Sequence, residues 1–264
     1  MRSRPRLCVL GCYAGGQSTM CTLVVATGLW RDVPLVVAAN RDELLRRPAS
    51  SPSWVVQGGV RFFAPRDLQA GGTWIGVNAH GLFVGITNRF TGHGSPKAPR
   101  SRGLLVLDAL SEDSATHAVR RIASESPARH EPFHLVMADA AGAHLVWNDG
   151  TRHHHEPLAP GFHVVTERSL NAAPSERVAR LRRELPALYG RVRPSAEQWM
   201  EVLRTHADPG MEGTCVHVPE HAYGTRSSTI LELGAAPRWW HADGPPCTTP
   251  YRELEDFAAR FADP

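Results

Sequence analysis

Cys21 directly follows Met20 and is the residue whose position suggests the clearest chemistry. If the chain is cut after Met20, Cys21 becomes the N-terminal residue, with a thiol nucleophile and a free α-amine. The amine can take the thiol proton, directly or through water, so one residue supplies both nucleophile and base. A cysteine beside a β-rich run is more commonly a small buried hydrophobe. The position after Met20 nevertheless makes Cys21 the leading candidate nucleophile.

A dense polar cluster, Asn40-Arg41-Asp42-Glu43, follows an apolar run. Charges at such a place are costly if they are buried without partners. In one interpretation, Arg41 pairs with a carboxylate to close a strand end. In the other, Asp42 orients the α-amine of Cys21, while Arg41 lowers the thiol pKa or binds a substrate carboxylate. Antiparallel pairing of the first two predicted strands would bring the cluster near Cys21, which favours the functional interpretation.

Two further polar residues are candidates for a site. Asn88 ends a predicted strand beside Arg89, where a side-chain amide can stabilise an oxyanion during acyl transfer. Asn78 precedes a glycine turn and is better explained as a turn residue. Arg226 lies in a polar, β-compatible run and can hold a carboxylate or support the nucleophile. The alternative for Arg226 is an exposed position on an edge strand.

The histidines and cysteines do not predict a metal site. The tract His153-His154-His155 lacks ligand spacing and is expected in an exposed, proline-flanked loop. Cys215 and His217 share one face of a predicted strand and can bind metal or haem, but core packing is the favoured interpretation. The cysteines number five, an odd number, and their spacings fit no zinc motif. We therefore expect neither a disulfide framework nor a metal, in a reducing cytoplasm.

Composition limits the class of protein. The 264 residues are 42% hydrophobic, which is enough for one sizeable core. The net charge is +3 and is spread along the chain, so we expect no nucleic-acid partner. No apolar run approaches the roughly 20 residues that span a bilayer, so no stable membrane insertion is expected. Lys97 is the only lysine among many arginines, a bias typical of a GC-rich bacterial genome.

The segment 1–19 is expected to be an N-terminal extension, ahead of a single domain over 20–264. Its apolar stretch is shorter than the roughly 7–15 residues of a signal-peptide core. Three interpretations remain: a start codon assigned too early, a propeptide whose removal exposes Cys21, or a genuine tail. The first is favoured.

Alternating and helical patterns predict an α+β domain. Strands come in hairpin pairs, and helices fall between the hairpin groups, which favours antiparallel sheets covered by helices. The predicted strands are 22–27, 34–39, 71–77, 82–87, 133–138, 143–147, 161–166, 214–218, 225–233 and 238–241. The predicted helices are 101–109, 112–124, 174–188, 195–206 and 253–261.

Several motifs together resemble the NRDE-domain family, also known as the transport and Golgi organisation protein 2 family. They are Met20-Cys21-Thr22, Asn40-Arg41-Asp42-Glu43 with Arg47-Pro48, Gly71-Gly72-Thr73-Trp74-Ile75-Gly76, Thr87-Asn88 and Tyr223-Gly224-Thr225-Arg226. The resemblance implies a branch of the N-terminal-nucleophile (Ntn) hydrolase superfamily and a four-layer αββα sandwich of antiparallel sheets. Related cysteine amidases act on conjugated bile acids and penicillin V.

By this resemblance, Cys21 is the nucleophile, Asp42 holds its amine, Asn88 is an oxyanion donor and Arg226 is the arginine near the nucleophile. We assign substrate binding to Arg41, Asn40 and Glu167. Two positions depart from the amidase pattern. Ala39 stands where the amidases have an arginine, and Glu167 stands where an asparagine is expected. A carboxylate would repel an oxyanion, so the second departure affects half of the oxyanion hole.

The sequence therefore predicts an N-terminal-cysteine hydrolase of linear amides, with a small-molecule amide as partner and no required cofactor. The alternative is a non-catalytic haem carrier on the same fold, because the family is associated with haem mobilisation. The chain contains no C-x-x-C-H motif. Haem would therefore be bound non-covalently.

Overall fold

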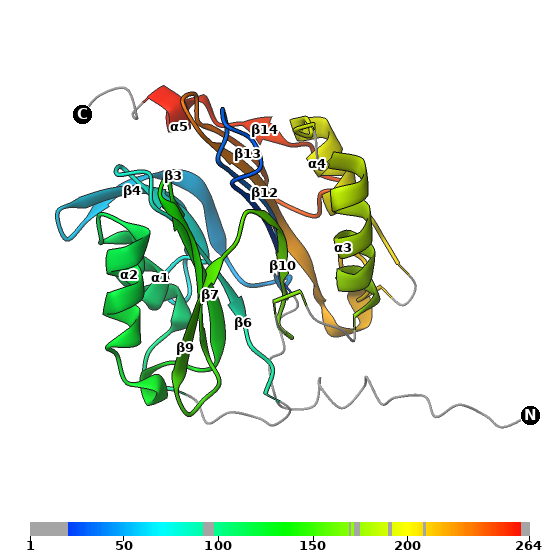
Figure 1. The fold of residues 1–264 in the computed structure, drawn as a ribbon. Helices are drawn as coiled ribbons and strands as arrows, with labels where there is room; N and C mark the ends of the chain where they lie inside the picture. Colours follow the sequence, from blue (N-terminus) through cyan, green and yellow to red (C-terminus); the bar gives the residue numbers. More distant parts are fainter. Residues whose placement is uncertain are drawn as a thin grey trace, which may run out of the picture.

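Two antiparallel sheets pack face to face, and helices cover both outer faces (Figure 1). The computed structural model describes residues 21–91, 98–168, 170–171, 175–189, 192–207 and 210–259. The layers run helix, sheet, sheet, helix, which confirms the α+β sandwich expected from the sequence. Residues 1–19 lie outside the described part of the chain. Within the described part, no helix is long and apolar enough to cross a membrane.

The first sheet holds the strand that follows Cys21. Its main path runs in the order β10-β1-β2-β12-β13-β14, and β11 pairs with β12. β1 and β2 are antiparallel, with Thr22 opposite Asn40. The strands are β1 (Thr22–Thr27), β2 (Leu35–Leu44), β10 (Gly161–Val165), β11 (His217–Val218), β12 (Tyr223–Leu233), β13 (Arg238–Ala242) and β14 (Arg252–Glu253).

The second sheet is a meander in which each strand pairs with the next one along the chain. Its strands are β3 (Ala49–Gln57), β4 (Val60–Asp67), β5 (Ile75–Asn78), β6 (Phe83–Asn88), β7 (Phe133–Asp139), β8 (Gly142–Asn148) and β9 (His153–Leu158). The end of β6 brings Asn88 to the same side of the sandwich as Cys21, and both line one cavity.

Alternation along the strands divides the core into layers. Leu23 and Val37 face the second sheet, while their neighbours Val24 and Val36 face helices. The helices of the first sheet are α3 (Glu176–Tyr189) and α4 (Ala196–Arg204), and those of the second are α1 (Arg102–Leu110) and α2 (Ala115–Ala123). Short helices complete the chain at η2 (Pro127–Arg129), η3 (Pro219–His221) and α5 (Glu255–Ala259).

Local signals explain where the helices begin. Ser195 caps α4 and forms a capping box with Gln198, while Ser101 and Ser114 cap α1 and α2 through their side chains. Gly72 permits a close approach of β5's leading segment to α1. A Cβ at Gly72 would lie 2.3 Å from the Gly103 main chain. Gly72 is therefore needed for this close contact between two backbone segments.

Two expectations about elements were wrong, and one hairpin was not predicted. β2 continues through Asn40-Arg41-Asp42-Glu43 instead of ending there, because β12 pairs along its full length. The hairpin β3–β4 was missed, since β3 is half-exposed and carries serines and a proline without clean alternation. The tract 153–155 belongs to strand β9, not to an exposed loop, and His154 stacks on Trp147 at 4.8 Å between ring centroids.

Candidate active site

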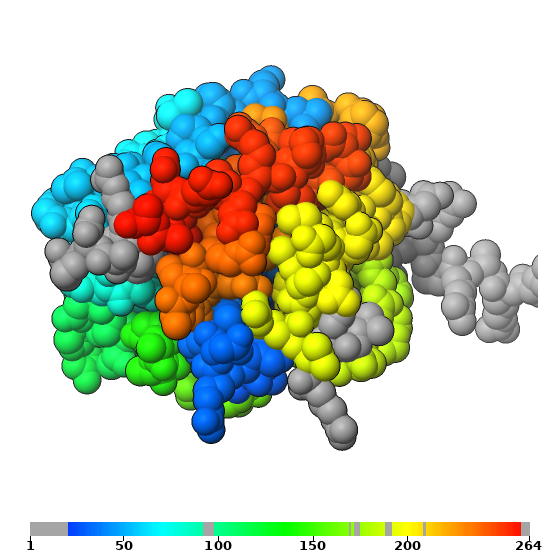
Figure 2. All heavy atoms as spheres, turned by 90° about the horizontal axis from the view of Figure 1, so that it is seen from above, coloured from blue at the N-terminus to red at the C-terminus, as the bar shows by residue number. Residues whose placement is uncertain are grey.

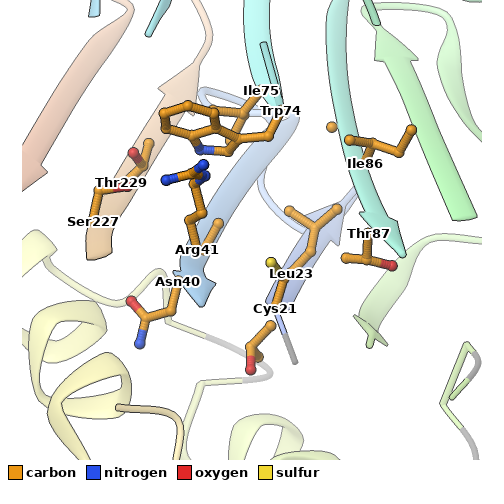
Figure 3. A pocket seen from close by; sticks show the side chains of 13 residues that line it. Cys21, Leu23, Asn40, Arg41, Trp74, Ile75, Ile86, Thr87, Ser227 and Thr229 are labelled. Atoms are coloured by element: carbon orange, nitrogen blue, oxygen red, sulfur yellow. The ribbon is translucent and has the colours of Figure 1, made fainter. Parts of the chain in front are cut away.

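Cys21 lies just before β1, where the two sheets open onto a cavity of about 410 Å³. The same cavity is lined by Arg41, Trp74, Asn88 and Arg102. In Figure 3, Cys21 lies between Arg41 on β2 and Thr87 on β6. Four elements, β1, β2, β6 and α1, thus converge on the thiol. The structure brings together Cys21, Arg41 and Asn88, as the sequence predicted.

The Cys21 thiol is enclosed by protein although the residue keeps some surface exposure. Its Sγ lies 3.7 Å from the carbonyl oxygen of Asp42, to which it donates. Burial and, to a smaller extent, the Asp42 charge raise the pKa of Cys21 to about 12, while Arg41 lowers it. Arg41 therefore acts in the expected direction but is outweighed. With a peptide bond on its nitrogen, this thiol is a weak nucleophile near neutral pH.

Asp42 is fully buried on β2. Thr225 Oγ1 donates to its Oδ1 at 2.6 Å, whereas Oδ2 accepts no hydrogen bond within the described chain. Burial raises the pKa of Asp42 to about 7, against the opposing effects of Arg177 and the Thr225 hydrogen bond. Asp42 is thus a buried carboxyl group with one oxygen available to a further donor.

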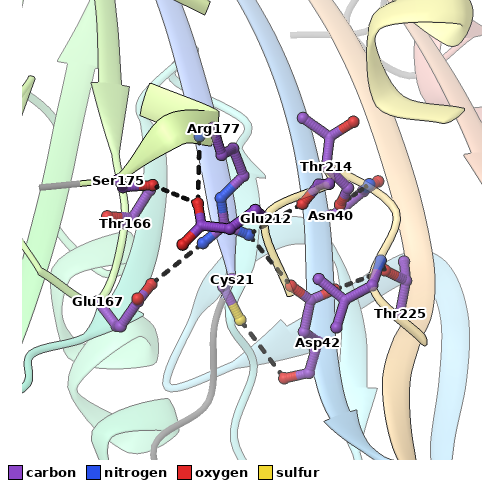
Figure 4. Close-up of polar contacts among 12 residues, drawn as sticks. Cys21, Asn40, Asp42, Thr166, Glu167, Ser175, Arg177, Glu212, Thr214 and Thr225 are labelled. Carbon is purple, nitrogen blue, oxygen red and sulfur yellow. Dashed lines mark hydrogen bonds and ion pairs between the residues drawn. The ribbon is translucent and has the colours of Figure 1, made fainter. Parts of the chain in front are cut away.

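Arg177 on α3 is a residue that the sequence reading missed (Figure 4). Its side chain is only 1% exposed, and its guanidinium lies 3.9 Å from Asp42 Oδ2 and 3.4 Å from Glu167 Oε2. Its backbone N–H donates to Glu212 Oε2 at 3.2 Å, which fixes the start of the helix. One feature of the sequence indicates that Arg177 is buried: it precedes Leu181 by one turn, on the apolar face of a predicted helix.

Glu167 lies beside this arginine and does not line the cavity that holds Cys21. Burial raises the pKa of Glu167, and the Arg177 and Arg168 charges lower it. The carboxylate that departs from the amidase pattern thus has cationic partners. Asn88 does line the cavity, and its assignment as an oxyanion donor stays a prediction.

Asn40 and Arg226 have surroundings that differ from those expected. The Asn40 amide donates to Leu203 O at 2.9 Å and to Thr214 O at 2.8 Å, and it accepts from Ser228. These partners direct its side chain toward the helix layer. Asn40 also lines a small hollow beside Cys21 (Figure 3), and its assignment to substrate binding stays a prediction. Arg226 is the extra residue of a bulge in β12 and does not line the cavity around Cys21.

The Arg41 side chain is fixed in position next to the thiol. Its guanidinium lies 4.2 Å from the centre of the Trp74 ring, and carboxylates of Glu43 and Asp67 lie 3.8 and 3.9 Å away. Nη1 is buried and makes no hydrogen bond within the described residues. Arg41 therefore keeps one directed donor for a bound molecule.

The rest of the cavity rim is built from paired charges. Arg47 bonds Asp67 through Nε and Nη2, at 2.9 and 2.7 Å. Arg102 lies 3.1 Å from Glu131, and Arg100 bonds Asp108 from α1. Because each of these arginines has a carboxylate partner, the rim is polar and rigid without being an open anion site.

The layered αββα fold is one that solved amidases of the Ntn-hydrolase fold share. A Caenorhabditis elegans N-acylethanolamine-hydrolysing acid amidase ortholog is similar, with a TM-score of 0.56, 17% identity, and coverage of 92% of this chain and 97% of that one. A variant of the Clostridium perfringens conjugated bile acid hydrolase has a TM-score of 0.54 and 10% identity, covering 89% and 96%. At such identities the likeness shows the fold alone.

The chain belongs to the Transport and Golgi organisation 2 family, whose model matches residues 20–238. The Bos taurus Transport and Golgi organization protein 2 homolog is 28% identical over 232 residues, 76% of this chain and 82% of that protein. The Drosophila melanogaster Transport and Golgi organization protein 2 is 25% identical, covering 75% and 81%. The family resemblance read from the motifs is therefore confirmed.

Proposed function

We propose that this protein is an N-terminal-cysteine hydrolase of linear amide bonds, active once its chain begins at Cys21. One observation supports this most: Asp42 Oδ2, buried beside Cys21, accepts no hydrogen bond within the described chain. The register that places Thr22 opposite Asn40, extended by one residue, sets Cys21 opposite Arg41 and next to Asp42. A free α-amine at Cys21 would supply a donor for Asp42.

Cutting the chain before Cys21 would change the charge balance of the site. The new α-ammonium would lie near the Asp42 carboxylate and lower its pKa, because an opposite charge favours the ionised form. It would also lower the pKa of the Cys21 thiol and act on it as a proton acceptor when neutral. The enclosed thiol, now with a pKa near 12, would become a usable nucleophile only after processing.

The reaction then follows acyl-transfer chemistry. Cys21 Sγ attacks the amide carbonyl carbon while its proton passes to the α-amine. The tetrahedral oxyanion is stabilised by the predicted donor Asn88. The C–N bond breaks as the α-ammonium returns the proton to the leaving amine, which gives a thioester. Water, deprotonated by the same amine, attacks the thioester, releases the carboxylic acid and regenerates the thiol.

Substrate recognition is assigned to Arg41. Its buried Nη1 provides a hydrogen bond to an oxygen of the acyl group or to a substrate carboxylate, and Trp74 fixes the guanidinium plane. The cavity of about 410 Å³ suits a small acyl amide. Polar, paired charges on the rim favour a substrate with a polar end exposed there.

Haem does not fit this cavity well. Among its described lining residues there is no histidine or methionine, and Cys21 is the one side chain of a type that commonly ligates haem iron. A thiolate ligand must be deprotonated, whereas burial and Asp42 raise the pKa of Cys21 to about 12. The haem carrier therefore gains no support from the residues around Cys21.

The test is an amide-substrate screen on protein whose mature N-terminus is Cys21, read out as released amine. Cys21→Ala should abolish turnover, and the matched variant Cys12→Ala should leave it unchanged, because Cys12 precedes the cut. Absence of turnover in a broad panel of acyl amides, together with saturable haem binding that survives Cys21→Ala, would favour the carrier and contradict the hydrolase.

A further inference from the structure

A second cluster of reactive side chains lies outside the cavity. It consists of His206 after α4, Cys215 and His217 at β11, and Cys247 between β13 and β14. One ligand atom from each lies within 4.8 Å of the others. His217 Nε2 is 3.4 Å from Cys215 Sγ and 3.3 Å from Cys247 Sγ. Two nearby segments and the more distant Cys247 thus direct two thiols and two imidazoles at one point.

The fold holds these segments firmly. Cys215 N–H donates to Thr205 O at 3.0 Å, which joins the segment before β11 to the end of α4. Arg204 Nε donates to Pro246 O at 3.0 Å, which joins α4 to the loop that contains Cys247. In Figure 2 the yellow segment that includes α4 lies against the red C-terminal segment on one face of the molecule. Cys215 and His217 are two positions apart in extended chain, so their side chains lie on the same face.

We propose that His206, Cys215, His217 and Cys247 form a binding site for one zinc ion. Two thiolates and two imidazoles are a ligand set typical of tetrahedral structural zinc. Zn–S bonds of about 2.3 Å and Zn–N bonds of about 2.0–2.1 Å place tetrahedral ligand atoms roughly 3.3–3.8 Å apart. Two pairs already have such separations, at 3.4 and 3.3 Å. Only small side-chain movements would complete the set.

The chemistry of the cluster favours a cation over its alternatives. His206 and His217 are exposed, so a cation can reach the site from solvent. A porphyrin does not fit, because four ligand atoms within 4.8 Å of one another leave no room for its plane. Four protein ligands also leave no open position for catalysis, so the site is structural.

The proposed zinc site adjoins the support of Asp42. Val216, between Cys215 and His217, donates its N–H to Thr225 Oγ1 at 2.8 Å, and Thr225 donates to Asp42 at 2.6 Å. Thr214 O, next to Cys215, accepts from Asn40. Zinc would therefore fix the segment 214–217, which orients Thr225. This role does not depend on any cut before Cys21.

The test uses full-length, untagged, reduced protein with zinc alone, followed by cobalt as a spectroscopic substitute. We expect one zinc per chain and, with cobalt, the intense absorption of tetrahedral thiolate coordination. Cys247→Ser, at a partly exposed position, should weaken zinc binding by about 100-fold or more and remove most of the thiolate absorption. His206→Ala, at an exposed position, should weaken binding without unfolding the chain.

Controls separate this site from other thiols. Cys21→Ser, and the pair Cys8→Ser and Cys12→Ser, should each bind zinc as the wild type does. Added zinc should raise the midpoint of thermal unfolding of the wild type but not of Cys247→Ser. Zinc content below about 0.1 per chain after incubation with excess metal, or binding lost only in the Cys8 and Cys12 pair, would overturn the proposal. A Cys215–Cys247 disulfide in protein isolated with zinc present would also overturn it.

Discussion

The protonation of Asp42 can be tested through the pH dependence of stability. The perturbation is Asp42→Asn in a Cys21→Ala background, which keeps the Met20–Cys21 peptide bond intact. Asparagine retains the acceptor for Thr225 Oγ1 but cannot lose a proton. The variant thus imitates a permanently neutral Asp42, and its difference from the parent isolates this one group.

The sign follows from the two states of the chain. Burial raises the pKa of Asp42 from 3.8 to about 7. Between about pH 4 and pH 7 the unfolded chain releases this proton while the folded chain keeps it, so the free energy of unfolding falls as pH rises. At about 1.4 kcal/mol per pH unit, the free energy of unfolding has fallen by on the order of 4 kcal/mol once the pH reaches about 7. The variant does not suffer this loss.

The assay is urea unfolding of both proteins at several values between about pH 4 and pH 8. The variant should match the parent near pH 4 and exceed it increasingly up to about pH 7, with a plateau beyond. Buried histidines with lowered pKa values, such as His134 and His241, affect both proteins equally and cancel in the difference. A stability difference that is independent of pH, or that shrinks as pH rises, would refute the assignment of a raised pKa to Asp42.

Three further outcomes follow from the same site. In a chain still carrying residues 1–20, Cys21 should be alkylated very slowly at pH 8, since a pKa near 12 leaves about one thiolate in ten thousand. Peptide mass mapping measures the alkylation rate, and a rate like that of free cysteine would contradict this prediction. Gly72→Ala should destabilise the fold by about 2 kcal/mol or more, because its Cβ would lie 2.3 Å from the Gly103 main chain, and thermal unfolding measures it. Arg41→Lys should lower kcat/KM by about 10- to 100-fold, because one directed hydrogen bond is lost; unchanged kinetics would remove Arg41 from substrate binding.

Local sequence patterns were enough to predict most helices and strands, and also the proximity of Asp42 to Cys21. Strands 22–27 and 225–233 alternate or are continuously apolar, and their predicted positions match β1 and much of β12. The antiparallel pairing of β1 and β2 then placed Asp42 near Cys21, as expected. That prediction succeeded because one short turn joins the two strands, so register alone relates their ends.

The parts that were missed depend on contacts between distant segments. Arg177 reaches Asp42 from α3, and no local pattern reports where an arginine on a helix will point. Cys247 meets Cys215 only because the loop between β13 and β14 folds onto α4. Cysteine spacings along the chain therefore give no sign of the zinc site that we propose from the tertiary structure. The polar β3 lacked the alternation that marks a strand.

The most direct test of the central claim is the N-terminus of the mature protein, determined by intact mass spectrometry and N-terminal sequencing after expression of the full reading frame. The account predicts a chain that begins at Cys21, with a free α-amine beside the thiol and within reach of Asp42. A mature chain that retains Met20 would have no N-terminal nucleophile and would contradict the proposed hydrolase.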